Sequence, residues 1–199
     1  MTRKVVMFCM AALLTLAAGS AMAADSIKGR LGITGRIGFL VPADSEITAV
    51  PGIANVGTDV GFVGGGGFIY GITDNIAAEF DITHTGFGSN TALDFDTTNL
   101  SLGVQYRFLN VPIRHFVPYV GAGLDILLNG ANEGLSVDDT VGVHLCGGFD
   151  YFVMRELALT SEIKGVIAPD ADINAGGTKV GNFDPSSFSM TFGVRYFFN

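Results

Sequence analysis

The chain has little of several residue types, and each shortage excludes a class of protein. It has no tryptophan, 6 prolines and 2 cysteines among 199 residues. Cys9 lies in an apolar N-terminal segment and only Cys146 follows it, so the folded part cannot hold an internal disulfide framework. There are 11 lysines and arginines against 19 aspartates and glutamates. This acidic balance argues against a nucleic-acid partner, which needs a basic surface.

Long apolar runs are also missing. Beyond the first 23 residues, no stretch reaches the roughly 18 consecutive apolar residues of a membrane helix, although 48% of the chain is hydrophobic. High hydrophobicity without such a helix leaves two classes of protein. One is a soluble β-protein with a large core, and the other is a membrane β-barrel.

The first 23 residues have the three parts of a secretory signal peptide. Arg3 and Lys4 form a basic start, residues 5–18 are an apolar run, and residues 21–23 match an A-x-A cleavage site. The apolar run is too short to span a bilayer as a helix. We therefore expect residues 1–23 to be removed on export, which lowers the formal net charge by two, from −8 to −10. Residues 24–199 are expected to form one domain.

The rest of the chain contains repeated alternation with a period of two, which predicts β-strands. In residues 186–198, for example, Phe192, Val194 and Tyr196 alternate with Gly193 and Arg195. The alternating segments are about 11–13 residues long, which fits tilted membrane strands better than the shorter strands of soluble sheets. The eight segments are residues 29–40, 60–71, 76–87, 97–108, 117–128, 139–151, 157–167 and 186–198.

The connections between these segments alternate in length. The short ones are residues 72–75, 109–116 and 152–156, and the long ones are residues 41–59, 88–96, 129–138 and 168–185. Short periplasmic turns and longer extracellular loops are the rule in outer-membrane barrels.

All five tyrosines fall at segment ends that this rule puts near the periplasm. A ring with a polar tip suits the headgroup region of a membrane. The alternation around Tyr119 points it into the lumen, whereas Tyr70, Tyr106, Tyr151 and Tyr196 are expected to face outward.

These patterns predict an all-β fold, an eight-stranded antiparallel up-and-down transmembrane β-barrel in a Gram-negative-type outer membrane. Closure pairs every backbone N–H and C=O, as a hydrocarbon environment requires. The interior of an eight-stranded barrel is just wide enough for side chains, so paired charges are expected to form a polar plug in the lumen. The expected plug residues are Arg36, Glu79, Asp81, Arg107, Asp125, His144, Asp150, Glu162, Lys164 and Arg195.

No motif predicts a catalytic, cofactor-binding or metal-binding residue. Residues 61–67 are glycine-rich but lack the spacing of a phosphate loop, and the G-x-S-x-G motif of hydrolases is absent. His144 and Cys146 share a strand face, but two ligands are too few for a structural zinc site. A lipid hydrolase would need a hydroxyl near His84. That alternative stays open, while the chain is expected not to be an enzyme.

Four stretches resemble the outer membrane protein W family, which includes the alkane-uptake barrel AlkL. They are residues 70–79, 118–124, 148–152, and 184–185 together with 192–197, and they occur in the family's order. The resemblance implies an eight-stranded barrel that passes small hydrophobic molecules through an apolar pocket in its extracellular half, with a lateral exit through the wall. Strand phase makes Leu40, Val63, Leu127 and Val166 the expected pocket residues.

The expected function is therefore passive uptake of small hydrophobic molecules, with outer-membrane lipid and lipopolysaccharide around the barrel. The alternative is a structural or adhesive surface protein with a plugged, inert lumen. In either case the loops are candidate contacts for a phage or a bacteriocin. An apolar cavity in the upper lumen favours transport, and a lumen filled throughout favours the alternative.

Overall fold

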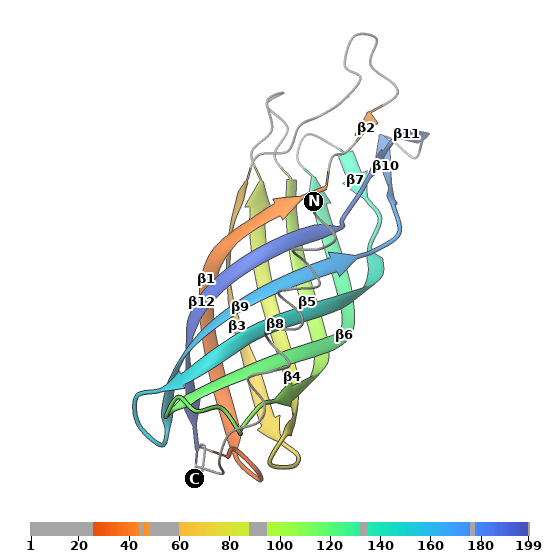
Figure 1. Ribbon diagram of the computed structural model, residues 1–199. Coiled ribbons are helices and arrows are strands. Elements are labelled where there is room, and N and C mark those ends of the chain that lie inside the picture. The colour runs from red at the N-terminus through yellow and green to blue at the C-terminus, as the bar shows by residue number, and fades with distance from the viewer. Residues whose placement is uncertain are drawn as a thin grey trace, which may run out of the picture.

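The computed structural model describes residues 26–43, 46–47, 60–87, 95–131, 135–175 and 178–198. The expected signal peptide lies outside the described residues, so its removal and the boundary at residue 24 stay predictions. Eight long strands wrap around one axis (Figure 1). They are β1 (Leu31–Pro42), β3 (Gly61–Gly71), β4 (Ile76–Phe87), β5 (Phe95–Arg107), β6 (Phe116–Ala131), β8 (Thr140–Phe152), β9 (Leu157–Ile167) and β12 (Ser187–Phe197).

The eight strands form a closed antiparallel barrel in the order β1-β12-β9-β8-β6-β5-β4-β3. Each strand pairs with its neighbour in the chain, and β1 closes the barrel against β12. The predicted fold is confirmed, and the predicted strand bounds differ from the observed ones by at most three residues. No helix in the described part of the chain is long and apolar enough to cross a membrane.

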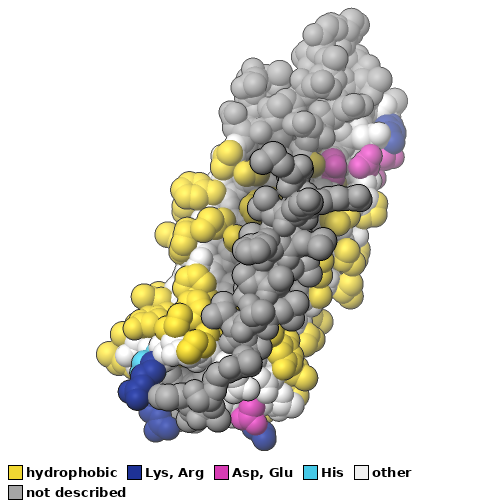
Figure 2. All heavy atoms as spheres, in the orientation of Figure 1, with side chains coloured by type: hydrophobic (Ala, Val, Ile, Leu, Met, Phe, Trp, Pro, Cys, Tyr) yellow, Lys and Arg dark blue, Asp and Glu magenta, His cyan; other side chains and the backbone are white. Residues whose placement is uncertain are grey.

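The outer wall of the barrel is apolar and its interior is polar. In β1, Ile37 and Phe39 are each 60% exposed, whereas the alternate residues Thr34 and Arg36 are each 5% exposed. Figure 2 shows hydrophobic side chains over the wall and charged side chains toward the two ends. This is the reverse of a soluble sheet, and it suits a wall that faces lipid.

The two ends of the barrel differ. We call the end with residues 72–75, 108–115 and 153–156 the turn end, and the opposite end the loop end. Near the turn end, four tyrosines face outward and are each 44–48% exposed, while Tyr119 is 1% exposed inside the lumen. The predicted directions of all five tyrosines are confirmed. The outward tyrosines are Tyr70, Tyr106, Tyr151 and Tyr196.

Short strands at the loop end correct the sequence prediction. They form a four-stranded sheet beside the barrel mouth, in the order β2-β11-β10-β7 (Figure 1). The expected loops 41–59, 129–138 and 168–185 contain these strands and so are not wholly irregular. The strands are β2 (Glu46–Ile47), β7 (Leu135–Val137), β10 (Ala171–Ala175) and β11 (Thr178–Phe183).

An apolar plug closes the lumen at the turn end. Phe152 and Phe197 stack there with ring centroids 5.6 Å apart, and both are at most 2% exposed. Phe197 faces inward because it lies on the same face of β12 as Gly193 and Arg195. Its ring packs in this plug, at a position where the alternation predicts a polar side chain. The plug consists of Ile27, Ile69, Ala77, Val117, Phe152, Ala158 and Phe197.

Candidate binding cavity in the barrel lumen

A chain of ion pairs crosses the lumen next to the apolar plug. Arg36 of β1 donates from Nη2 to Glu79 Oε1 of β4 at 2.7 Å and from Nη1 to Glu162 Oε1 of β9 at 2.8 Å. Asp81 Oδ1 lies 3.1 Å from the same Nη2. These four side chains are at most 7% exposed. Because an unpaired buried charge is costly, the four groups hold one another in place across the barrel.

Arg195 of β12 continues the chain of ion pairs. Its Nη2 donates to Glu79 Oε1 at 2.5 Å, and its Nη1 contacts both carboxylate oxygens of Asp150 at 3.0 Å. Arg107 Nη2 of β5 donates to Asp150 Oδ2 at 2.8 Å. Arg107, Asp150 and Arg195 are all 0% exposed. Glu79 and Asp150 are therefore bridges, since each carboxylate joins two guanidinium groups.

Two neutral side chains complete this network. The ring centroid of Tyr119 lies 5.1 Å from Arg195 Cζ, and its hydroxyl donates to Glu162 Oε2 at 3.1 Å. Gln105 Nε2 donates to the second oxygen of Glu79. Together with the apolar plug, these contacts fill the half of the lumen nearest the turn end.

A second polar cluster lies between this network and the loop end. Lys164 Nζ donates to Ser101 Oγ at 3.0 Å, and Asn99 Nδ2 donates to Asp125 Oδ1 at 2.8 Å. His144 Nδ1 lies 2.6 Å from Asp125 Oδ2 and 3.4 Å from Ser101 Oγ. A catalytic triad needs the nucleophile and the orienting carboxylate on opposite ring nitrogens. Here both contact Nδ1, so the cluster positions His144 and does not activate Ser101.

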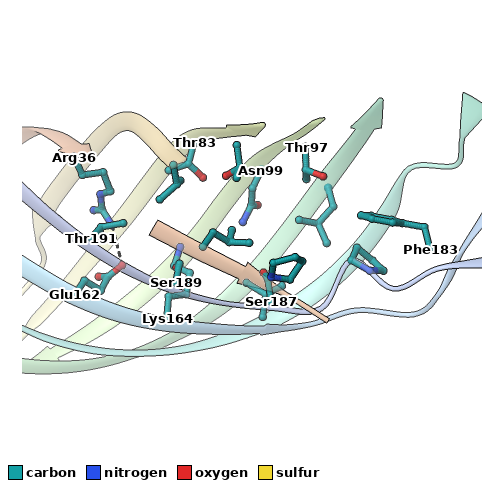
Figure 3. Close-up of a pocket in the computed structure, with 17 residues that line it drawn as sticks. Arg36, Thr83, Thr97, Asn99, Glu162, Lys164, Phe183, Ser187, Ser189 and Thr191 are labelled. Atoms are coloured by element: carbon teal, nitrogen blue, oxygen red, sulfur yellow. Dashed lines mark hydrogen bonds and ion pairs between the residues drawn. The ribbon is translucent and has the colours of Figure 1, made fainter. Parts of the chain in front are cut away.

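A cavity of about 40 Å³ opens in the lumen toward the loop end, with room for a few water molecules. All four predicted pocket residues line it. Figure 3 shows the ion pair of Arg36 and Glu162 at one end of the cavity and Phe183 at the other. The apolar part of its wall consists of Leu40, Pro42, Val63, Leu127, Val166, Phe183 and Pro185.

The rest of the cavity wall is polar, which differs from the expected apolar pocket. Hydroxyl groups from three strands, β4, β5 and β12, face the same space as the seven apolar residues. Lys164 and the Arg36–Glu162 ion pair form its floor (Figure 3). The polar wall consists of Thr83, Thr85, Thr97, Asn99, Ser187, Ser189 and Thr191. The cavity is therefore amphipathic, and ligand binding by its apolar residues stays a prediction.

The ten predicted plug residues all lie on the lumen face. Nine are at most 7% exposed, and Lys164 is half-buried. Sequence reasoning did not single out Gln105, Ser101 or Asn99, although all three have the same parity in β5 as Arg107. These residues could have been predicted, because polar residues at steps of two from a predicted lumen charge lie on the same face of the strand.

His84 lies on the outer wall, away from the lumen. Its Nδ1 is 3.0 Å from Thr98 Oγ1, its partner in the β4–β5 ladder. The hydrolase alternative required such a hydroxyl, but catalysis also needs a group that orients the imidazole, and no carboxylate among the described residues contacts His84. The expectation that the chain is not an enzyme stays a prediction. Among these residues, no three potential ligands are grouped to hold a metal ion.

A comparison of the whole chain with models of protein families agrees with the closed barrel, its apolar wall and its filled lumen. The model of the outer membrane protein β-barrel domain matches residues 10–199. The chain belongs to the outer membrane protein β-barrel domain family. By the rule for outer-membrane barrels, its turn end faces the periplasm and its loop end faces outward. None of the curated proteins that were compared with the chain matches its sequence.

Several solved outer-membrane barrels share this fold. OprG from Pseudomonas aeruginosa is 17% identical with a TM-score of 0.70, over 88% of this chain and 99% of OprG. Neisserial surface protein A is 16% identical with a TM-score of 0.63, over 86% and 98%. AlkL in lipid bilayers is 19% identical with a TM-score of 0.60, over 92% and 94%. At these identities the likeness is one of fold, and it agrees with the predicted resemblance to the group that includes AlkL.

Proposed function

We propose that this outer-membrane barrel gives small hydrophobic molecules a passive path from its loop-end cavity sideways into the bilayer. The observation that carries this proposal is a gap in the wall ladder beside the cavity. The β8 strand begins at Thr140, but its pairing with β9 begins only at Val143 and Ile167. In the described wall, Thr140 and Val141 pair with β6 alone.

Backbone contacts frame this gap on both sides. The Val143–Ile167 pair bounds it toward the turn end. Toward the loop end, Asp138 N donates to Asp172 O at 3.1 Å, where the β7–β10 pairing begins. We call the space between residues 139–142 and residues 168–171 the lateral window. A short break in the ladder is the place where a wall opens at the least cost in hydrogen bonds.

Apolar groups join the cavity to the lateral window. Leu127 and Val166 line the cavity and pack against Ala168. A Cβ placed on Gly142 would lie 2.9 Å from the backbone oxygen of Ile167 and 3.0 Å from Ala168 Cβ, so the window is narrow. On the outer wall beside it, Val141 and Ile167 are 62% and 72% exposed. An apolar solute on this route therefore stays in contact with apolar groups.

The other routes are unfavourable for such a solute. Passage straight through the lumen would separate the buried ion pairs of Arg36, Arg195 and Asp150, which is costly. Passage around the outside meets the headgroups and polysaccharide of the outer leaflet. The cavity holds only a few water molecules, so a solute would displace side chains such as Leu127 as it enters.

The proposal is tested by the uptake rate of an apolar probe such as octane in cells that lack the protein, with and without its expression. Leu127→Arg puts a charge into the cavity wall, and Leu127→Met is the matched control that keeps the wall apolar. We expect expression to speed uptake, Leu127→Arg to abolish the gain and Leu127→Met to retain most of it. Unchanged uptake with a folded barrel in the membrane would overturn the transport proposal.

The small sheet at the loop end favours a second candidate, a structural or adhesive surface protein. Strands β2, β7, β10 and β11 extend the protein beyond the barrel mouth (Figure 1). A partner such as lipopolysaccharide, a phage or a bacteriocin could bind there without using the lumen. Unchanged octane uptake, together with lost cell-surface binding when residues 171–183 are replaced by a short Gly-Ser linker, would favour this role.

A further inference from the structure

Of the charged groups in the cavity floor, Lys164 has the fewest hydrogen bonds and ion pairs to other side chains. It projects from β9 opposite Ser189 of β12 and Cys146 of β8 in the strand register. Its ammonium carries three N–H donors, and the bond to Ser101 Oγ at 3.0 Å uses one. Figure 3 shows Lys164 beside Ser189, between the Arg36–Glu162 pair and the far end of the cavity.

The carboxylates near Lys164 already contact other cations or donors, and Glu79 and Asp81 both pair with Arg36. Glu162 accepts from Arg36 at 2.8 Å and from Tyr119 at 3.1 Å. Asp125 accepts from Asn99 at 2.8 Å and lies 2.6 Å from His144 Nδ1. In the part of the chain that the structure describes, no carboxylate forms an ion pair with Lys164. A half-buried cation in this position is complemented best by an anionic ligand.

The hydroxyl groups of the cavity wall add to this preference. Ser189 and Thr191 on β12, and Thr83 and Thr85 on β4, line the same cavity. A pure hydrocarbon would displace water from the ammonium and the hydroxyls and leave them without partners, which is unfavourable. A carboxylate head can accept from both Lys164 and a hydroxyl, while a hydrocarbon tail contacts Leu127 and the rest of the apolar wall.

We propose that the cavity, widened by displacement of side chains such as Leu127, binds a medium-chain fatty acid, with its carboxylate on Lys164 and its tail along the apolar wall toward the lateral window. The ligand is a monoanion, because Arg36, the other cation of the floor, is already engaged by three carboxylates. The head stops at Lys164, since the ion-pair network fills the lumen beyond it. This inference rests on the proposed function and narrows its substrate class from apolar molecules to amphipathic acids.

The test is binding of ¹³C-carboxyl-labelled octanoate to the purified barrel in nanodiscs of zwitterionic lipid, followed by NMR. Lys164→Met removes the charge, Lys164→Arg keeps it, and Lys179→Met is a matched control at the exposed loop end. We expect Lys164→Met to weaken octanoate binding at least about tenfold, as loss of a charged hydrogen bond implies. Lys164→Arg should retain most of the affinity, and Lys179→Met all of it.

Octanol separates charge from chain length, because it has a similar tail and a neutral head. We expect octanol to bind at least about tenfold more weakly than octanoate. Equal binding of octanol and octanoate, or equal octanoate binding by the Lys164→Met and Lys179→Met proteins, would overturn the fatty-acid proposal. If Lys164→Met does not fold, reductive methylation of Lys164 in the unmodified protein replaces it. Octanoate should slow that methylation, and an unchanged rate at saturating octanoate would overturn the proposal.

Failure of this inference is distinguishable from failure of the proposed function. Octane uptake that depends on expression, together with no octanoate binding, would remove the fatty-acid site and leave the transport path. Octanoate binding to the purified barrel without any gain in cellular uptake would retain the site and remove the path. If both the transport path and the fatty-acid site exist, cells take up octanoate as well as octane through the barrel. The ratio of octanoate uptake to octane uptake should then fall in the Lys164→Met strain and stay constant in the Lys179→Met strain.

Discussion

At the scale of single residues, Arg195 joins the two bridging carboxylates of the lumen network. It is 0% exposed and contacts both bridging carboxylates, Glu79 and Asp150. We expect Arg195→Met to destabilise the barrel by about 3–5 kcal/mol, because it leaves buried negative charge without its partner. Urea unfolding of the protein in lipid vesicles, followed by circular dichroism, measures the change.

Arg155→Met is the matched control for Arg195→Met. Arg155 is exposed in the turn between β8 and β9, and its carbonyl oxygen, which accepts from Arg30 at 2.8 Å, is kept in the variant. Surface changes of this kind alter stability by less than about 0.5 kcal/mol. Equal stability of the two variants would mean that the ion-pair chain does not hold the lumen together.

Asp74, in the turn between β3 and β4, provides a pH-dependent prediction. A hydrogen bond from Ser26 Oγ at 2.8 Å, with a smaller contribution from Lys28, lowers the pKa of the Asp74 carboxyl below its ordinary value. Because the pKa of Asp74 is lower in the folded state, its ionised carboxylate stabilises the folded protein at pH values above the ordinary pKa of aspartate. This stabilisation is lost as the pH falls through the folded-state pKa. NMR titration should show the pKa of Asp74 rising toward its ordinary value in Ser26→Ala and rising less in Lys28→Met. A larger rise in Lys28→Met would show that charge, and not the hydrogen bond, sets the pKa.

The alternation in the sequence was enough to place the ten charged and polar residues in the lumen, but not to pair them. Arg36, Glu79 and Glu162 come from β1, β4 and β9, and they meet only because the barrel closes with a particular stagger between its strands. A period of two predicts which face of the strand a residue occupies. Its position along the barrel axis, in contrast, depends on the pairing register of every pair of neighbouring strands. The contact partners therefore could not be predicted from one sequence.

At the scale of elements, glycine sets how closely β1 approaches β12. A Cβ on Gly38 would lie 2.1 Å from the backbone oxygen of Met190, which no side-chain rotation relieves. Gly35, in the same strand but facing outward, has nothing within 4 Å of an added Cβ. We expect Gly38→Ala to cost about 1–3 kcal/mol and Gly35→Ala to change stability by less than about 0.5 kcal/mol. Urea unfolding compares the two, and equal stabilities would mean that the strands shift apart without strain.

The eight barrel strands could be predicted because each alternates over many residues, but the loop-end sheet could not. In β10, residues 171–175 include Asp172 and Asn174, which are disfavoured in strands and common in turns. The two residues of β2 pair with β11 from a distant part of the chain, through Glu46 opposite Asn182. Pairing between separate loops is set by their positions above the barrel mouth, which no local pattern encodes.

At the scale of the whole molecule, the lumen is divided into layers with different roles. The apolar plug and the ion-pair network close the periplasmic half, and only the outward half contains the amphipathic cavity. The resemblance implied an apolar pocket, but hydroxyls of β4, β5 and β12 lie among its apolar residues. In the proposed function, the lateral window is the route out of the cavity that crosses the fewest buried charges.

A reversible staple across the lateral window tests that route. Gly142→Cys and Ala168→Cys, combined with Cys146→Ser to remove the native thiol, place two Cβ atoms 3.0 Å apart, and the Cβ at residue 142 also meets the backbone oxygen of Ile167 at 2.9 Å. The two segments must therefore move apart by at least about 0.5 Å to reach the Cβ separation of 3.5–4.5 Å that a disulfide needs. Oxidation should lower octane uptake to the level of cells without the protein, because β8 and β9 can no longer part, and reduction should restore it. Cys146→Ser alone should transport normally under both conditions. If the stapled barrel, with its disulfide verified by mass, still transports at the reduced rate, solutes do not leave between β8 and β9.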